Sequence, residues 1–521
     1  MKKTTLLLVL LTVTATLSAQ SPSWAKKAAQ AVFTLKTFKT DGTLLASSNG
    51  FFVSEQGDAV SSFTPFRGAQ SAVVIDSQGK EWPVTAIVNA NDMYDVAKFQ
   101  VAVKKASSLH TANTPAGTGA TVWLLPYSTE KSPVCQRGTV SSAESFQTVY
   151  TYYTLNMQAD ERHTSCPVLN DNGEVIGLLQ SATDGSAATS YAVSARFATS
   201  LEASALMMND PSMQSTAIPK AVPTTYKDAL LSLVIAGSTL DNRQYDDYVN
   251  RFIQQFPGQS DGYVYRARNR AAVNDFAGAD QDMQQAVRVA DQKDDVHYQY
   301  ALLIFQKVLY SDQPYDAWTL DRALEEAQLA YQSNPMPVYR QQQAQILFAQ
   351  NKYAEAYTIF DELTKGEQHN AETFYAAAQC KLQLQEKKEA LMLLDSAVNT
   401  FSRPYVKTAT PYLIARAELS MDMRRYQQAI NDMQDIVTLE PNNAGLWAQK
   451  ASYELRVNLF DQALESAQQC LRLDPQGSDG YLMSGIAQCA KGDRQQGLPN
   501  LQKAKELGND QAQTFIDKYS K

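Results

Sequence analysis

The chain has 521 residues, of which 44% are hydrophobic and 19% charged, and its formal net charge is −8. This length exceeds what one hydrophobic core normally serves and predicts two or three domains, while the hydrophobic content argues against a disordered chain. The acidic balance, without any block of basic residues, argues against nucleic acid as a partner.

The first residues have the layout of a secretory signal peptide. Lys2 and Lys3 precede an apolar run from Leu6 to Leu11, and small residues follow. The run is too short to cross a bilayer, and no later segment reaches the length of a transmembrane helix. We therefore expect residues 1–19 to be a signal peptide and the mature protein to be exported without a transmembrane segment. The periplasm is the expected compartment, with the outer surface and the medium as alternatives.

Residues 24–205 alternate apolar and polar side chains in the manner of β-strands, with turn residues at short intervals. The turn sequence 76–79 separates two apolar runs, and so does Asn172-Gly173, so both places predict β-hairpins. Many short strands at this spacing predict an all-β barrel or sandwich.

The pattern changes after residues 206–225, a Pro-, Ser- and Thr-rich stretch that indicates a linker. From Tyr226 onward a period of 3.6 residues predicts helices, and residue types recur every 34 positions. A large residue recurs at Leu413, Trp447 and Tyr481, small residues recur at Ala417, Ala451 and Gly485 and again at Ala429, Ala463 and Gly497, and proline recurs at Pro441 and Pro475.

This order of residue types is the pattern of tetratricopeptide repeats, in which small residues let two antiparallel helices cross closely and proline ends the second. We expect an all-α solenoid of about eight helical hairpins over residues 226–510, closed by a capping helix over 511–521. Such arrays present a groove lined by the first helix of each hairpin, and an ordinary solvated helix face is the alternative for each candidate. The groove candidates are Val264, Arg268, Gln341, Gln345, Tyr375, Gln379, Ile414, Glu418, Ala448 and Ser452.

Four stretches of the β domain resemble the trypsin-like serine protease fold, and most closely its HtrA-type branch. The stretches are Gly50–Val60, Tyr94–Val101, Pro167–Gly177 and Tyr191–Val193, and they occur in the family's order. The resemblance implies a double β-barrel, a triad in the chain order His, Asp, Ser, and backbone donors for an oxyanion.

Carried over residue by residue, the resemblance puts Thr64 at the position of the catalytic His, Asp95 at the Asp and Thr164 at the nucleophile. A threonine hydroxyl cannot accept and return a proton at neutral pH, and nothing lowers its pKa at the nucleophile position. The oxyanion loop has Arg162 and His163 where the family has Gly followed by Asn or Asp. We therefore predict a pseudoprotease with no catalytic residues.

Two departures from this interpretation remain open at the level of sequence. A shift of one residue would make Ser165 the nucleophile, but it would not supply a base. An active serine or threonine endopeptidase with non-standard catalytic residues is the alternative function, and it needs a proton acceptor within hydrogen-bond reach of the hydroxyl. His163 borders Thr164, but neighbouring side chains on an extended chain point apart.

The cysteines and histidines give little sign of further chemistry. Cys135 and Cys166 share the first domain and are a candidate disulfide that spacing alone does not decide. The turn 171–174 lacks the ligand ladder of a calcium loop, so no metal or cofactor is expected. Cys380, Cys470 and Cys489 fall at helical core positions, and the spacing of His110, His163, His297 and His369 matches no zinc site.

Together these features predict an exported, non-catalytic binding or scaffold protein for protein or peptide partners. A purely structural role in an envelope complex, with the β domain as a docking block, is the other alternative. The partner and the oligomeric state are not encoded in any pattern that we recognise.

Overall fold

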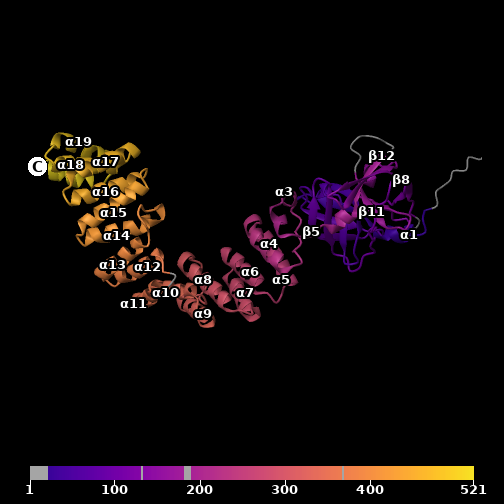
Figure 1. Ribbon diagram of the computed structural model, residues 1–521, viewed down its shortest axis with the longest axis horizontal. Coiled ribbons are helices and arrows are strands. Elements are labelled where there is room, and N and C mark those ends of the chain that lie inside the picture. The colour runs from indigo at the N-terminus through magenta and orange to yellow at the C-terminus, as the bar shows by residue number, and fades with distance from the viewer. Residues whose placement is uncertain (1–20, 131–132, 181–188, 367–368) are drawn as a thin grey trace, which may run out of the picture. The chain divides into compact units, whose positions relative to one another are not determined.

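The computed structural model describes residues 21–130, 133–180, 189–366 and 369–521 (Figure 1). The chain divides into two compact units, Met1–Val289 and Ala290–Lys521. The expected signal peptide lies outside the described residues. Within the described ranges, no helix combines the length and apolar character that a membrane span requires.

The first unit begins with a closed six-stranded barrel in the order β1-β2-β3-β6-β5-β4. The hairpin predicted around residues 76–79 is confirmed, because Val74 of β4 pairs with Trp82 of β5. Phe33, Phe52 and Phe99 are buried inside the barrel. The strands are β1 (Val32–Phe38), β2 (Leu44–Phe52), β3 (Asp58–Ser61), β4 (Ser71–Ile75), β5 (Glu81–Asn91) and β6 (Val96–Val101).

A second closed six-stranded barrel follows in the order β10-β11-β12-β9-β8-β7. The hairpin predicted at Asn172-Gly173 joins β10 to β11, but its loop is longer than two residues, since the Asn170 amide donates to the Glu174 carbonyl. Gly173 has a φ of +80°, which a glycine adopts without strain. The strands are β7 (Thr121–Leu124), β8 (Gln136–Phe146), β9 (Tyr150–Asn156), β10 (Pro167–Leu169), β11 (Val175–Gln180) and β12 (Thr189–Ser194).

Residues 206–225, expected as a linker, form an ordered segment that we call the strap. It contains the end of the 3-10 helix Ala205–Asn209 and the short helix α3 (Pro211–Gln214). The Ile87 amide of β5 donates to the Pro219 carbonyl, and the Ala221 amide donates to the Ile87 carbonyl, both at 2.8 Å. The strap therefore pairs with β5 of the first barrel instead of crossing solvent.

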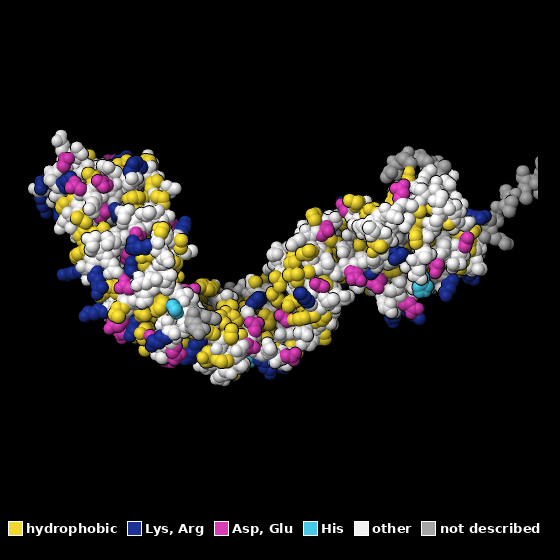
Figure 2. All heavy atoms as spheres, viewed as in Figure 1, with side chains coloured by type: hydrophobic (Ala, Val, Ile, Leu, Met, Phe, Trp, Pro, Cys, Tyr) yellow, Lys and Arg dark blue, Asp and Glu magenta, His cyan; other side chains and the backbone are white. Residues whose placement is uncertain are grey.

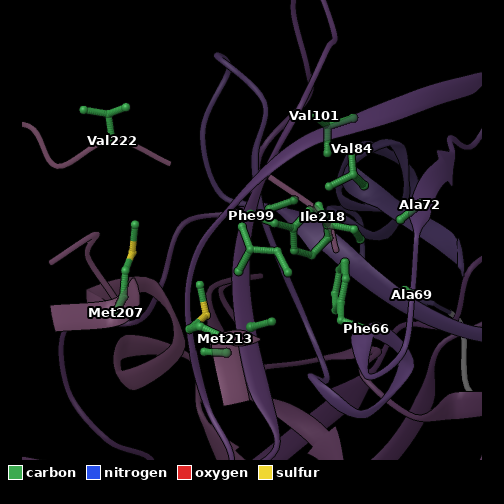
Figure 3. Packing of buried hydrophobic residues seen from close by; sticks show 14 of the residues in the cluster. Phe66, Ala69, Ala72, Val84, Phe99, Val101, Met207, Met213, Ile218 and Val222 are labelled. Atoms are coloured by element: carbon green, nitrogen blue, oxygen red, sulfur yellow. The ribbon is translucent and has the colours of Figure 1, made fainter. Parts of the chain in front are cut away.

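The strap also completes the hydrophobic core of the first barrel. Figure 3 shows Met213 and Ile218 of the strap beside Phe66 and Phe99 of the barrel, and all four belong to one buried cluster. The same cluster continues into the first helical hairpin, α4 (Tyr226–Thr239) and α5 (Asn242–Gln255). Its helical members are Ala229, Leu233, Ala236, Tyr245, Tyr248, Val249 and Phe252.

Helices α4 to α19 of the described chain form eight consecutive pairs, and the shorter α20 (Ala512–Tyr519) follows them. In the last pair a β-carbon on Gly485 would lie 2.9 Å from the Gly497 carbonyl oxygen, so these two helices cross where a side chain would not fit. The remaining helices of the first unit are α6 (Ser260–Ala272) and α7 (Phe276–Val289). Those of the second are α8 (Asp294–Tyr310), α9 (Leu320–Ser333), α10 (Pro337–Ala349), α11 (Tyr353–Thr364), α12 (Ala371–Gln383), α13 (Lys387–Asn399), α14 (Thr410–Asp422), α15 (Tyr426–Leu439), α16 (Ala444–Arg456), α17 (Phe460–Leu473), α18 (Ser478–Ala490) and α19 (Arg494–Glu506).

The turn inside several hairpins uses one conformation. A residue with positive φ follows the first helix and reverses the chain into the second, as helix C-terminal caps commonly do. The residues are Asn274, Asn351, Gln385, Arg424, Asn458 and Gly492.

Candidate functional site

The structure brings the first two triad positions together. The Asp95 Oδ1 atom accepts hydrogen bonds from the Thr64 amide at 2.7 Å and the Thr64 hydroxyl at 2.9 Å. It also accepts one from the Phe63 amide at 3.0 Å. The carboxylate thus holds the turn after β3, at the place where the resemblance would put an imidazole.

Ser165, the alternative nucleophile, is buried within the fold. Its side chain is 1% exposed, and its Oγ accepts a hydrogen bond from the Ser62 amide at 2.9 Å. The Ser48 hydroxyl lies 3.3 Å from the same oxygen. The backbone of Ser165 has a φ of +66°, in a region that favours glycine, and the resemblance aligns this position with a glycine. The hydroxyl therefore ties the loop to the first barrel and does not face solvent.

The two backbone amides that would stabilise an oxyanion already have acceptors. The Arg162 amide donates to Asp160 Oδ1 at 3.0 Å, and the Thr164 amide donates to the Glu161 carbonyl at 3.1 Å. Both bonds belong to the 3-10 turn Glu161–His163, which is capped by Asp160. The Asn49 side-chain amide of β2 donates to the Arg162 carbonyl at 2.7 Å and to the Thr164 carbonyl at 3.1 Å, which fixes the loop from the other side.

His163 belongs to the same cap. Its Nδ1 accepts a hydrogen bond from the Asp160 amide at 3.3 Å and lies 3.0 Å from Asp160 Oδ1. Arg162 donates to the other carboxylate oxygen, and this hydrogen bond lowers the pKa of Asp160 from its ordinary value. The Nδ1 atom thus caps the 3-10 turn by accepting the hydrogen bond from the Asp160 amide. The other histidine in the described part of the first unit, His110, is exposed, and its carbonyl pairs with the Val175 amide.

The candidate disulfide is not formed. Cys135 and Cys166 are both buried free thiols, and they belong to different hydrophobic clusters. Burial raises the pKa of Cys135 to about 11 and that of Cys166 to about 12, so both remain protonated at neutral pH. Cys380, Cys470 and Cys489 are buried as expected.

Two of the groove candidates are wrong. Val264 is 7% exposed and Ala448 is 6% exposed, because the helical packing covers both side chains. Arg268 is exposed, with its guanidinium 5.5 Å from the centre of the Tyr265 ring. The remaining candidates, which stay exposed or half-buried, are Gln341, Gln345, Tyr375, Gln379, Ile414, Glu418 and Ser452.

The surface of the second unit carries no single sign of charge on the face that Figure 2 shows, where basic and acidic side chains are interspersed. A cavity of about 490 Å³ in this unit includes the candidate Gln341 in its lining, together with Arg340 and Glu362, which form an ion pair at 2.9 Å. This surface suits a partner of mixed polarity better than a strongly charged one.

Sequence reasoning missed a buried polar pair that repeats inside the hairpins. Arg416 of α14 makes two hydrogen bonds to Asp432 of α15, at 2.6 and 2.9 Å. The equivalent positions, also sixteen residues apart, are Arg266 with Asp282 and Lys450 with Ser466. The recurring interval was the available signal, and the pairs fix one helix of a hairpin against the other.

Comparisons with known proteins find separate matches for parts of the chain. A sequence model of the family described as "Anaphase-promoting complex, cyclosome, subunit 3" matches residues 294–397. The Small glutamine-rich tetratricopeptide repeat-containing protein 2 of Saccharomyces cerevisiae is 28% identical over 93 residues, which are 18% of this chain and 27% of the yeast protein.

Among solved structures, the Rv3671c protease of M. tuberculosis in its active form matches 33% of this chain and 80% of its own, with 19% identity and a TM-score of 0.29. An HtrA-type protease, an AlgW variant with a tripeptide, matches 34% of this chain and 61% of its own, with 18% identity and a TM-score of 0.30. The chain thus spans about a quarter of the yeast relative and less than two thirds of the AlgW chain.

The predicted fold classes are confirmed: two closed six-stranded β-barrels are followed by a tetratricopeptide-type helical solenoid. Solenoids of this type work through extended surfaces that contact other proteins. The second half of the chain therefore implies protein–protein interaction.

Proposed function

We propose that this protein is an exported, non-catalytic binding or scaffold protein, whose helical array holds protein or peptide partners and whose trypsin-like domain is a pseudoprotease. The observation that carries the proposal is the state of the oxyanion loop. The amides of Arg162 and Thr164 donate to Asp160 and Glu161, so neither is directed to a substrate carbonyl.

Acyl transfer in this fold needs a general base, a nucleophile and preorganised oxyanion donors. Thr64 stands at the base position, and threonine has no basic nitrogen. Its hydroxyl donates a hydrogen bond to Asp95. The carboxylate of Asp95 is already shared among three donors of the turn. The base position and the oxyanion donors are thus engaged by different partners, which supports inactivity more strongly than a single substitution would.

The array supplies the surface through which the protein would act. Its remaining groove candidates include three glutamine amides and the larger side chains of Tyr375 and Ile414, which suits an extended peptide or an amphipathic helix. Export completes the proposal and rests on the layout of residues 1–19, and we propose the periplasm as the compartment, with the outer surface and the medium as alternatives.

Partner capture from a periplasmic extract tests the binding role with the full chain as bait. A Tyr375→Glu/Gln379→Lys double variant, which changes two half-buried side chains of α12, should lose the captured partners. The matched control changes exposed side chains of α19, Lys503→Glu and Gln502→Lys, and should retain them. Equal capture by both variants would contradict a groove on α12.

A further inference from the structure

A second cavity lies inside the first unit, between the strap and the start of α5. Its volume is about 400 Å³, within the range of small-molecule sites. Pro219 and Leu240 contribute apolar parts of the lining, while Gln70 and Gln244 contribute side-chain amides. The charged residues of the lining are Lys220, Asp241, Arg243, Asp247 and Arg251.

Lys220 of the strap is the unusual member of this set, because it is only 9% exposed. Its ammonium donates to the Thr216 carbonyl at 2.5 Å and to the Ile218 carbonyl at 3.0 Å. An ammonium has three donors, and within the described residues Lys220 forms no ion pair with a carboxylate. Burial lowers the pKa of Lys220 to about 8. Among the residues that the structure describes, one donor of the ammonium and its charge are therefore left without a partner.

The ammonium of Lys220 lies on the edge of the strap opposite to β5, and Lys220 lines the cavity. Pro219 and Ala221 use their backbone groups for β5, so the backbone groups of Ile218 and Lys220 point to the opposite edge. The ammonium bonds the Ile218 carbonyl on that opposite edge. The residues of α5 that line the cavity complete the wall.

The charged residues around the cavity indicate the net charge of a ligand that would fit there. Three cations, Lys220, Arg243 and Arg251, meet two carboxylates, so one positive charge is uncompensated. The Asp241 carboxylate is already engaged, since it accepts from the Gln244 amide at 2.8 Å as the N-cap of α5. A singly charged group balances this lining, whereas a phosphate carries between one and two negative charges at neutral pH and would be overcompensated.

We propose that this cavity binds a small organic carboxylate, with the carboxylate on the Lys220 ammonium and an apolar body against Pro219 and Leu240. The site is separate from the oxyanion loop and from the groove of the array. It therefore does not depend on the proposed function.

Benzoate is a suitable probe, because it joins one carboxylate to an apolar ring of a size that the cavity holds. Ligand-observed NMR titrations of the full-length protein, at constant ionic strength and pH 7, should show saturable binding of benzoate and none of benzamide, its neutral analogue. The Lys220→Met variant should weaken benzoate binding by about tenfold or more. The control Lys227→Met, on the exposed face of α4, should leave it unchanged.

The affinity for benzoate should fall as the pH rises from 7 to 9, because the ammonium of Lys220 loses its proton in this range. The other charged groups around it are the guanidinium groups of Arg243 and Arg251 and the carboxylates of Asp241 and Asp247. Arg251→Met provides a second variant that should also weaken binding, should Lys220→Met fail to fold by circular dichroism.

Three outcomes would overturn the proposal: benzoate fails to bind, benzamide binds equally well, or binding survives the loss of the Lys220 or Arg251 charge. An inorganic phosphate arm separates the two kinds of anion. Tighter Lys220-dependent binding of phosphate than of benzoate would show that the assignment to a carboxylate is wrong.

Discussion

At the scale of single residues, the polar side chains of the candidate site hold the local fold of the first unit. Ser165 stands at the turn between the oxyanion loop and β10, and its hydroxyl accepts the Ser62 amide of the first barrel. The carboxylate of Asp95 accepts hydrogen bonds from the amide and the hydroxyl of Thr64 in the turn after β3. Both side chains are thereby explained by structure alone, without a substrate.

Replacing Ser165 with alanine should destabilise the first unit by about 1–3 kcal/mol, because the buried Ser62 amide loses its acceptor. Alanine and serine tolerate the positive φ similarly, so the backbone cost is the same in both proteins. Differential scanning calorimetry of the full chain should show a lower temperature for the barrel transition. Ser145→Ala, at an exposed position of β8, is the control and should leave that temperature unchanged.

Lys220 makes the stability of the first unit depend on pH in the direction opposite to a salt-bridged lysine. Its pKa is about 8 in the folded protein and 10.5 when exposed, so above pH 8 the unfolded chain binds more protons. Stability therefore rises with pH, by about 2 kcal/mol between pH 7 and pH 9.5 from this residue. The difference in unfolding free energy between wild type and Lys220→Met, measured at both pH values, should change by this amount. A constant difference would show that burial does not perturb the amine.

At the scale of elements, each helical hairpin is held by close crossing at small residues and, in several hairpins, by a buried polar pair. The side chains of Arg416 and Asp432 are only 9% and 2% exposed. Burial raises the pKa of Asp432, and the hydrogen bonds from Arg416 oppose that rise. Such a pair adds little net stability, but losing one partner leaves a buried charge.

The Arg416→Met variant should lose about 3–5 kcal/mol of local stability in α14 and α15, while the Arg416→Met/Asp432→Met double variant should lose less, because the buried charge of Asp432 is removed as well. Hydrogen–deuterium exchange of these two helices measures the local free energy directly. The pair of the exposed Arg403 with the half-buried Asp435, at 3.0 Å, is the control, and Arg403→Met should cost less than about 1 kcal/mol. An equal or larger loss in the double variant would contradict this account.

At the scale of the whole molecule, the change from strands to helices in the sequence does not separate two hydrophobic cores, because one core includes residues of the first barrel and of the first helical hairpin. Met213 and Ile218 of the strap share one buried cluster with barrel residues such as Phe99 and with Leu233 and Phe252 of the first hairpin. The first hairpin therefore belongs, in packing, to the unit that holds the barrels.

A fragment of residues 21–225 should consequently expose the apolar face that α4 and α5 cover, whereas a fragment of residues 21–289 should keep it buried. We expect the shorter fragment to bind the dye ANS and to aggregate, and the longer one to remain monodisperse in size-exclusion chromatography. If the shorter fragment is as stable as the longer one, packing of the first hairpin against the barrel does not contribute to the stability of the first unit.

The strand pattern of the first half and the helical repeat of the second were enough to predict the fold, because both patterns are set by residues that lie close together in the sequence. Gly173 marks its hairpin by its own conformational freedom, and the interval of 34 residues repeats the same contacts along the array. The packing of the strap was not predictable, since Met213 and Ile218 lie in a Pro-rich stretch and find their partners far away in sequence. Burial of Val264 and Ala448 depends in the same way on the packing of surrounding helices.

For the candidate site, the sequence predicted which positions align with the protease triad, but not the hydrogen bonds that those residues make. The resemblance located Thr64, Asp95 and Thr164, but not the hydrogen bonds that occupy the oxyanion loop, because those depend on Asp160 and on Asn49 of a distant strand. The Lys220 cavity gave no sequence signal, since its lining comes from three separate segments and the burial of one lysine appears only after folding.

A peptidase assay on the purified full-length protein, with casein and fluorogenic peptides as substrates, tests the central claim most directly. Because the Thr64 hydroxyl donates to Asp95 and the amides of Arg162 and Thr164 donate to Asp160 and Glu161, we predict no turnover above that of a Thr64→Ala/Thr164→Ala variant prepared in parallel. Turnover by the wild-type protein that Thr164→Ala abolishes would contradict it.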